Sequence, residues 1–254
     1  MKRLFTFGCS FTQYWRWPTW ADALGQQADY FENWGMCGAG NSFIFNSLVE
    51  CNQRHGFNSN DTIIVMWTNT SREDRYVKDR WLGMGNIYWT AGQELPAEYV
   101  KRYACERGYL IRDLASITAA KKLLQSWQCH WKFFSMVPFS QTNLDIDLGS
   151  NPEDKVSQDQ DVRNLYKSTL DSIRPSVYET VFGSQWWAGN GIPDSYDSRR
   201  RDFHPTPTEH LAYLTAVSPE ILLQAKSIDW MQDWEHKIKT NTQIWSSSTL
   251  PARL

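Results

Sequence analysis

The strongest constraint on the fold is an unbroken apolar run, TIIVMW, at residues 62–67. A strand with one solvated face would alternate apolar and polar residues, so this run predicts a strand buried on both faces of a parallel sheet. Two shorter β-prone segments precede it, at residues 2–7 and 30–33. Each is followed by a segment with helical signals, at residues 18–27 and 41–54. This part of the chain therefore predicts the order β-α-β-α-β.

The alternation of strands and helices continues further along the chain. A helix with one apolar face is predicted at residues 112–128, directly before a strand at 130–136. A helix at residues 162–173 and a short last strand at 177–182 follow. Alternating elements of this kind predict an α/β fold with a central parallel sheet flanked by helices.

The segments outside this alternation complete the predicted organisation. Residues 71–108 are polar and aromatic without clear periodicity, and they are predicted to be an insertion on the core fold. A late helix begins at the N-cap Thr206 or Thr208, and a helical tail is predicted from about residue 228. We expect one domain over residues 1–254, with its ligand site beyond the carboxyl ends of the strands.

Charge and hydropathy disfavour several classes of protein. The chain carries 26 Lys and Arg against 28 Asp and Glu, so it lacks the excess positive charge that nucleic-acid binding uses. No apolar run approaches the ~20 residues of a membrane-spanning helix, and the first residues lack the apolar core of a signal peptide. We expect a soluble, cytoplasmic protein without nucleic-acid or membrane partners, and the sequence leaves its oligomeric state open.

Cysteine and histidine usage gives no metal or disulfide signature. The five cysteines are an odd set without a C-x-x-C pair, which predicts neither a zinc ribbon nor a disulfide framework. The five histidines are scattered and form no H-E-x-x-H pair. No metal site and no organic cofactor are predicted, and a reducing compartment fits the free thiols.

A serine, a histidine and an aspartate occupy a predicted strand end and a late loop. Ser10 follows the first strand, whereas Asp202 and His204 lie just before the late helix. A serine hydroxyl becomes a strong nucleophile when an imidazole takes its proton and a carboxylate fixes that imidazole's tautomer. The predicted catalytic set is therefore Ser10 as nucleophile, His204 as general base and Asp202 as the carboxylate that orients it.

Acyl transfer also needs hydrogen-bond donors for the oxyanion of the tetrahedral intermediate. Backbone N–H groups in glycine turns and the side-chain amide of asparagine are suitable donors. The sequence places a glycine cluster, GMCGAGN, at residues 35–41 after the second strand, and Asn69 after the third. Both lie at the edge of the sheet where Ser10 is expected.

The first two of these segments resemble blocks of the SGNH (GDSL-type) hydrolases. The sequence FGCSFT at residues 7–12 resembles the first block, with Ser10 as nucleophile and Cys9 in place of the aspartate of the name-giving motif. The sequence NWGMCG at residues 33–38 resembles the second block. This resemblance implies an oxyanion hole that includes the N–H groups of Ser10 and Gly38.

The last two segments resemble the remaining blocks of the same family. WTN at residues 67–69 lacks the glycine that usually stands two places before the asparagine, and it implies the Asn69 amide as a further oxyanion donor. DFHP at residues 202–205 resembles the terminal block, although Asp202 precedes His204 by two positions instead of three. That spacing is similar to the D-x-H of some SGNH-like acyltransferases and acetylesterases. The resemblance implies a three-layer α/β/α, flavodoxin-like sandwich.

Each candidate residue also has a purely structural or alternative interpretation. A lone Ser10 is typical of a helix cap or turn, Cys9 offers a thiol, and His210 is a rival base. The glycine cluster is also compatible with a tight turn whose N–H groups bind any anion. Arg72, Arg75 and the run at 199–201 are either solvated loop charges or groups that receive an acidic substrate or pair with Asp202. Four blocks in the family's order favour the catalytic interpretation.

Tryptophan is the most unusual feature of the composition, with 14 residues. Several lie close to the blocks described above or in the loop that precedes the last of them. An indole face suits the apolar face of a sugar ring, which favours a carbohydrate substrate. The predicted substrate-binding residues are Trp15, Trp34, Trp67, Trp186 and Trp187.

Taken together, the sequence predicts a serine esterase that hydrolyses small acyl esters, acetyl esters in the first place, on a small molecule or glycan. An O-acyltransferase with the same residues is the first alternative. A non-catalytic glycan-binding or structural module on this fold is the second, and it predicts Ser10 out of reach of His204 with Asp202 turned away. The compact, Trp-rich form of the blocks is similar to SGNH-type proteins encoded by bacteriophages, which would imply association with a virion.

Overall fold

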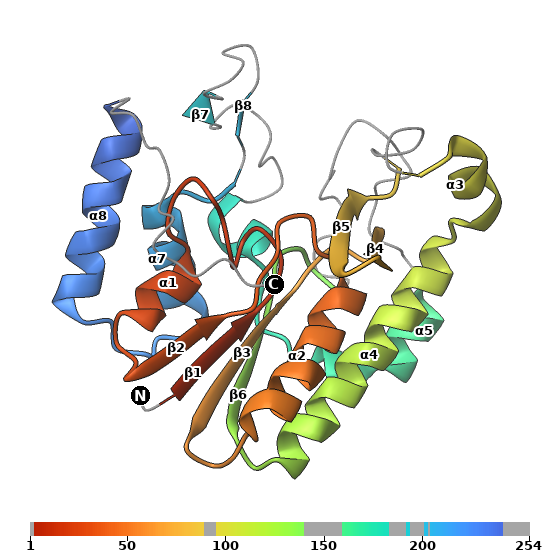
Figure 1. The fold of residues 1–254 in the computed structure, drawn as a ribbon, viewed down its shortest axis with the longest axis horizontal. Coiled ribbons are helices and arrows are strands. Elements are labelled where there is room, and N and C mark those ends of the chain that lie inside the picture. Colours follow the sequence, from red (N-terminus) through yellow and green to blue (C-terminus); the bar gives the residue numbers. More distant parts are fainter. Residues whose placement is uncertain are drawn as a thin grey trace.

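A four-stranded parallel sheet forms the centre of the protein (Figure 1). The computed structural model describes residues 3–88, 95–139, 159–182, 192–193, 201–202 and 204–240. The strands of this sheet lie in the order β2 (Tyr30–Asn33), β1 (Arg3–Phe7), β3 (Asp61–Trp67) and β6 (His130–Ser135). Every neighbouring pair is parallel, with Phe7 opposite Val65 in β1 and β3. The predicted parallel sheet is confirmed.

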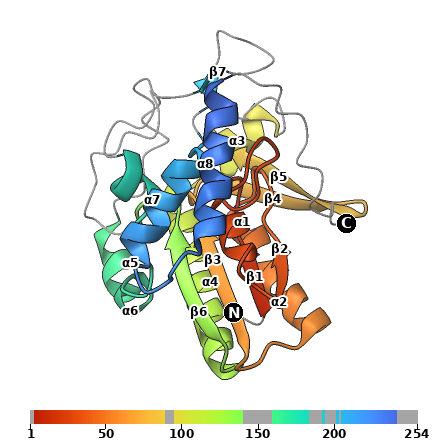
Figure 2. The ribbon, with the colours of Figure 1, turned by 90° about the vertical axis from the view of Figure 1, so that its left-hand side faces the viewer.

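Helices cover both faces of the sheet and give the predicted three layers. One face carries α1 (Trp20–Gly25), α7 (Pro207–Val217) and α8 (Ala225–Lys239), and Figure 2 shows α7 and α8 side by side. The other face carries α2 (Asn41–His55) and α4 (Glu106–Ser126) (Figure 1). The residues of β1 from Leu4 to Phe7 are fully buried, as expected for a strand between two helical layers. The α/β/α architecture is confirmed.

The remaining described elements are short. They are α3 (Ala97–Tyr103), α5 (Gln160–Leu165), α6 (Lys167–Leu170), and two paired two-residue strands, β7 (Ile192–Pro193) and β8 (Arg201–Asp202). The predicted helix at 162–173 is therefore two short helices. Among the described residues, no helix combines the length and the apolar character that crossing a membrane requires.

Residues 71–108, predicted as an insertion, contain regular structure of their own. β4 (Arg72–Val77) and β5 (Arg80–Asn86) form an antiparallel hairpin that is a sheet separate from the central one. Figure 1 shows the hairpin and α3 beyond the carboxyl ends of the central strands. The following helix, α4, begins at Glu106, six residues before the predicted start, because Cys105 acts as its N-cap and accepts a hydrogen bond from Gly108 N.

The predicted strand at 177–182 is wrong. Residues Tyr178–Phe182 form a short π-helix, and within the described ranges the edge of the sheet beside β6 carries a single bridge, between Phe133 and Ile173. Ser176 and Glu179 explain the difference, because they form a reciprocal capping box. Glu179 Oε2 accepts from Ser176 N at 2.7 Å, and Ser176 Oγ accepts from Glu179 N at 3.1 Å.

A capping box also begins α1, and it buries a carboxyl group. Asp22 Oδ2 accepts from Thr19 N at 2.8 Å, and the Thr19 hydroxyl caps the helix. Asp22 is 5 % exposed, and burial raises its pKa from 3.8 to about 6, although the hydrogen bonds from Thr19 lower it. Ionisation of this buried group therefore lowers the free energy of unfolding by a measurable amount.

That cost predicts a defined pH dependence for Asp22→Asn. The folded state holds the Asp22 proton up to pH of about 6 and the unfolded state only up to about 3.8, so ionisation favours unfolding between these values. The free energy of unfolding of the wild type, relative to Asp22→Asn, should fall by roughly 2 kcal/mol from pH 4 to pH 7. Urea unfolding of both proteins at the two pH values measures this change. A difference that does not vary with pH would contradict the buried, proton-binding state of Asp22.

Candidate active site

Ser10 lies in a tight turn directly after β1. The backbone N–H groups of Thr12 and Gln13 both donate to Cys9 O, at 2.9 and 3.0 Å, so the chain turns helically as soon as the strand ends. Gly8 makes this turn possible, because a Cβ at that position would lie 2.0 Å from Thr12 Oγ1. The turn places Ser10 at the carboxyl edge of the sheet with 6 % of its surface exposed.

Cys9, the alternative nucleophile, points into the core. It is fully buried, and its Sγ lies 3.7 Å from Met136 Sδ at the end of β6. A thiol in such surroundings is a packing group, since reactive cysteines are accessible and lie in electropositive surroundings. The turn therefore leaves Ser10 at the carboxyl edge of the sheet and buries Cys9 in the core.

Asp202 and His204 form a hydrogen-bonded pair despite their short spacing. Asp202 Oδ1 lies 2.7 Å from His204 Nδ1 and also accepts from the His204 backbone N at 3.0 Å. One carboxylate oxygen thus fixes both the backbone and the ring, which is possible because the residues are two positions apart. With Nδ1 bound to the carboxylate, Nε2 is the nitrogen available as a base.

The second oxygen of Asp202 is held by two residues from the segment after Ser10. Tyr14 OH donates to Asp202 Oδ2, and Arg16 Nη1 donates to the same oxygen at 2.7 Å. Burial opposes the ionisation of Asp202, but the hydrogen bond and charge of His204 and the bond from Tyr14 outweigh it. They hold the pKa of Asp202 well below its usual range. The carboxylate is therefore ionised whenever the protein is folded near neutral pH.

The imidazole of His204 is held against the turn that carries Ser10. The Tyr14 ring stacks on it, with centroids 4.1 Å apart and an interplanar angle of 16°. The Phe11 ring meets its edge at 5.5 Å, and Trp17 Nε1 anchors the same loop by donating to Pro205 O at 2.8 Å. These contacts bring together residues that are almost 200 positions apart in the sequence.

The structure also bears on the alternatives for these residues. Within the described chain, Ser10 and His204 form no hydrogen bond with each other, but Asp202 is turned toward His204 and bonded to it. Catalytic hydrogen bonds are often long before substrate binds and tighten in the complex. His210, the rival base, is 1 % exposed, and burial lowers its pKa to about 3, so it is a neutral core residue.

The Gly38 turn lies beside the Ser10 turn at the carboxyl edge of the sheet. Met36 N donates to Gly8 O at 3.0 Å, which joins the two turns directly. Asn33 joins them a second time, because its Nδ2 donates to Thr12 O at 2.8 Å. Gly38 has a φ of +75°, and a Cβ there would lie 2.8 Å from Gly83 O of β5. Glycine is therefore required both by the backbone conformation and by the hairpin packed on it.

Asn69 follows β3 at the same edge and is 6 % exposed. Its Oδ1 accepts from Ser71 N at 2.7 Å, which leaves the amide NH₂ group as the donor. The preceding residue is held by Asn41, whose Oδ1 accepts from Thr68 N at 2.8 Å and whose Nδ2 donates to Thr68 O at 2.9 Å. Asn41 also donates to the buried Asp113 of α4 at 2.7 Å. A buried polar network therefore joins the segments of Gly38 and Asn69.

The three predicted tryptophans that the structure describes, Trp15, Trp34 and Trp67, do not lie together. Trp67 is fully buried and packs edge-to-face on Phe133, which places it in the core. The Trp34 indole donates to Glu32 Oε2 at 2.7 Å and lies under Arg54, on the side of α2. Trp15 is 53 % exposed and lies beside Tyr14, so it is next to the His204 loop. Trp186 and Trp187 lie outside the described residues.

Sequence reasoning missed Tyr14 and Arg16 as parts of this site. The available signal was their position just after Ser10, but nothing in the sequence links them to a carboxylate so far along the chain. Arg72 reaches the same region: its Nη1 donates to Ala39 O at 3.0 Å, next to Gly38, and its Nη2 lies 3.6 Å from Met136 Sδ. Arg72 is therefore a half-buried cation at the edge of the Gly38 turn.

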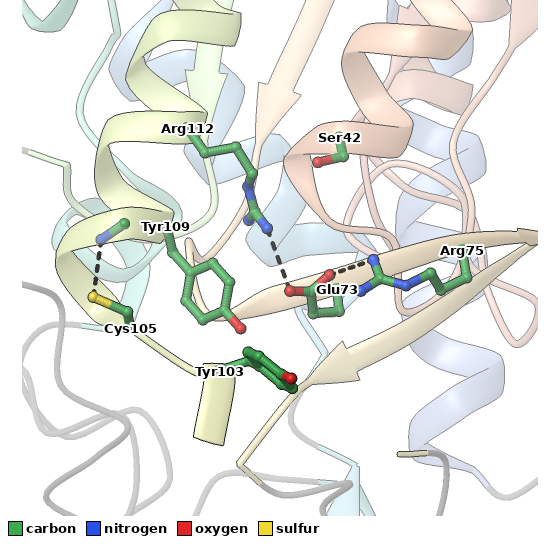
Figure 3. Close-up of a pocket in the computed structure, with 8 residues that line it drawn as sticks. Ser42, Glu73, Arg75, Tyr103, Cys105, Tyr109 and Arg112 are labelled. Carbon is green, nitrogen blue, oxygen red and sulfur yellow. Dashed lines mark hydrogen bonds and ion pairs between the residues drawn. The ribbon is translucent and has the colours of Figure 1, made fainter. Parts of the chain in front are cut away.

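A cavity of about 370 Å³ lies on the other side of the hairpin, between α2, β4, α3 and α4 (Figure 3). Its charged groups pair with one another. Arg75 Nη1 donates to Glu73 Oε2 at 2.6 Å, and Arg112 Nη1 lies 3.7 Å from Glu73 Oε1. Neither Ser10 nor His204 lines it. The cavity is thus separate from the candidate site, and its ion pairs hold the hairpin against α4.

Comparison with known proteins gives similarity in solved structures alone, since no family model and no curated protein matches the chain. The crystal structure of TesA and that of a lipolytic G-D-S-L family protein from Veillonella parvula DSM 2008 each match at 12 % identity. Each match has a TM-score of 0.45 and covers 87 % of this chain and 100 % of that chain. The psychrotrophic esterase EstA from Pseudoalteromonas sp., in a structure inhibited by monoethylphosphonate, matches at 10 % identity with a TM-score of 0.41. That match covers 92 % of this chain and 98 % of EstA.

Proposed function

We propose that the protein is a serine esterase that hydrolyses small acyl esters. The observation that carries this proposal is the Asp202–His204 pair, whose imidazole lies against the turn of Ser10 while Nδ1 is bound to an ionised carboxylate. That arrangement gives His204 the tautomer and the electrostatic support of a general base. No step of the proposed reaction needs a metal or an organic cofactor.

The proposed reaction proceeds by acyl transfer to Ser10. His204 Nε2 takes the proton of Ser10 Oγ while the oxygen attacks the ester carbonyl, and the negative charge moves to the carbonyl oxygen. The imidazolium that forms is stabilised by Asp202. His204 then gives the proton to the leaving alkoxide, so an alcohol departs and an acyl-Ser10 ester remains. Water, deprotonated by the same nitrogen, attacks that ester, His204 gives the proton to Ser10 Oγ as the acyl–oxygen bond breaks, and the acid departs.

The oxyanion is proposed to be bound by the N–H groups of Ser10 and Gly38 and by the Asn69 amide. Three hydrogen bonds support this role. Met36 N donates to Gly8 O and joins the Ser10 and Gly38 turns, Ser71 N donates to Asn69 Oδ1, and Thr68 N donates to Asn41 Oδ1. Donors held in place before the reaction do not reorganise when charge develops, and one such donor contributes about 3 kcal/mol. The rigidity of this edge is therefore part of the proposed catalytic machinery.

The proposed substrate is an acetyl ester on a carbohydrate or similar small alcohol. Trp15, which lies beside Tyr14 near the His204 loop, is the most exposed of the described residues in the predicted aromatic set. Indole faces stack on sugar rings.

Fluorophosphonate labelling tests the function directly. We expect one equivalent of phosphonyl group on Ser10, identified by peptide mass mapping, together with loss of aryl-acetate hydrolysis. The full chain is used, and Ser42→Ala, on the first turn of α2, is the matched serine control that should label like the wild type. A label on Cys9, a label elsewhere, or no label would overturn the assignment of Ser10 as nucleophile.

A further inference from the structure

A cluster of potential metal ligands lies between β2 and α2, at the end of the sheet where β1 begins. Glu32 of β2 and Cys51 and His55 of α2 each place one ligand atom within 4.8 Å of the other two. Glu32 and Cys51 are buried, and the His55 side chain is 22 % exposed. We propose that these three residues bind a thiophilic divalent cation, Zn²⁺ in the first place. This site is independent of the proposed esterase activity.

The local structure turns all three side chains toward one another. Along β2, Phe31 faces α1, where its ring packs on Gly25, so Glu32 on the opposite face points toward α2. Cys51 and His55 are four residues apart and therefore lie one above the other on α2. The sequence signal is C-x-x-x-H, a spacing that a search for paired histidines misses. A strand and a helix, both rigid, thus supply the ligands.

The distances suit tetrahedral zinc. His55 Nε2 and Glu32 Oε2 are 3.1 Å apart. Nitrogen and oxygen ligands on one tetrahedral Zn²⁺ are about 3.3 Å apart, and a thiolate sulfur lies about 3.6 Å from each of them. Since Cys51 Sγ is within 4.8 Å of both, a shift of about 1 Å completes the three-residue set. Water at the partly exposed His55 side provides the fourth ligand.

Neighbouring groups hold the carboxylate and surround the site. Tyr30 OH donates to Glu32 Oε1, and Trp34 Nε1 donates to Glu32 Oε2 at 2.7 Å. Outer hydrogen bonds of this kind fix the orientation of metal-binding side chains. The Phe5 ring lies 5.1 Å from the ring of His55, so the surroundings are apolar. A carboxylate held by two donors beside an aromatic wall is well placed for a buried cation.

Charge balance also favours a divalent, thiophilic ion. Binding forms bonds from Zn²⁺ to the Cys51 sulfur, the Glu32 oxygen and His55 Nε2, and it releases to solvent the thiol proton and any proton on Nε2. One thiolate and one carboxylate then neutralise the two positive charges, which makes burial of the ion acceptable. Calcium and magnesium, which select oxygen ligands, do not fit this set.

Cobalt titration of the full chain tests the proposal, because Co²⁺ replaces Zn²⁺ and reports its ligands by absorption. We expect one equivalent of Co²⁺ to produce a thiolate-to-metal charge-transfer band, and Zn²⁺ to abolish that band and raise the Tm. Cys51→Ser should lose the band. A Cys37→Ser, Cys105→Ser double variant should keep it, because those thiols are exposed and belong to other segments.

A second variant keeps the test informative should Cys51→Ser fold poorly. His55→Gln changes a partly exposed residue at a helix end, and it should lower the Zn²⁺ affinity at least about tenfold. His236→Gln, on an exposed position of α8, is its control and should leave the affinity unchanged. No charge-transfer band and no Tm shift in the wild type would show that Glu32 and His55 are a hydrogen-bonded pair only. A band that survives Cys51→Ser would likewise overturn the site.

Discussion

Ser10→Ala is expected to lower kcat/KM for an aryl acetate by at least ~10³-fold without changing the Tm appreciably. The expected loss is large because the nucleophile, its base and the orienting carboxylate act as a unit, so removal of one disables the others. The side chain removed is small, and its hydroxyl makes no hydrogen bond within the described chain, so little folding energy is lost. Hydrolysis of 4-nitrophenyl acetate together with thermal melting measures both quantities.

Cys9→Ser is the matched control for Ser10→Ala. It changes the neighbouring residue, which is fully buried, and it should retain at least about a tenth of the wild-type rate if Ser10 is the nucleophile. Full activity in Ser10→Ala, or a loss confined to Cys9→Ser, would refute the proposed chemistry. The pair therefore distinguishes a serine esterase from a thiol enzyme on the same turn.

Asp202→Asn is expected to lower kcat by roughly 10²–10⁴-fold with a smaller change in KM. The amide carries no charge to stabilise an imidazolium, and its NH₂ group cannot accept from Tyr14 OH or Arg16, the partners of Asp202 Oδ2. Steady-state kinetics across a pH range gives the measurement. A rate close to that of the wild type would mean that another group orients His204.

Arg16→Gln provides the comparison for Asp202→Asn. It removes one of the donors to Asp202 Oδ2 but leaves the hydrogen bond between Asp202 and His204 in place. We expect a loss of about tenfold in kcat, because the carboxylate keeps its charge and its contact with the imidazole. If Arg16→Gln loses as much activity as Asp202→Asn, the Arg16 charge itself would be required for catalysis. The orientation of His204 by Asp202 would then not explain the effect of Asp202→Asn.

Much of the central fold could be predicted because its two inner strands, β1 and β3, are buried on both faces. The run at 62–67 has one interpretation in such a setting, and Gly56 ends α2 with a φ of +58° as a glycine after a helix is expected to do. The hairpin could not be predicted. β4 and β5 carry charged residues and glycines whose partners are backbone groups of the Gly38 turn. Their sequences therefore lack the alternation of apolar and polar residues that identifies a strand on an apolar core.

The candidate site also contains residues that the sequence predicts and residues that it does not. Ser10, Asp202 and His204 could be proposed from the residue types that acyl transfer uses and from the order of the blocks that the sequence resembles, and the structure brings the Asp202–His204 pair next to the Ser10 turn. Tyr14 and Arg16 are not, since any turn tolerates them and their value lies in a partner 186 or more positions away. Trp67 shows the opposite error: proximity in sequence to Asn69 suggested contact with substrate, but β3 directs its ring into the core.

The packing of β5 on the Gly38 turn limits which sequence changes the hairpin beside the candidate site can accept. Gly85 N donates to Gly38 O at 3.0 Å, and a Cβ at Gly83 would lie 2.8 Å from Ala39 N. A hairpin grafted from another protein would have to bring a glycine to that position or deform the turn. Asp79, exposed at the tip of the hairpin, carries no such packing constraint. Natural drift and directed evolution should therefore both accumulate changes at the tip while the strand beneath stays fixed.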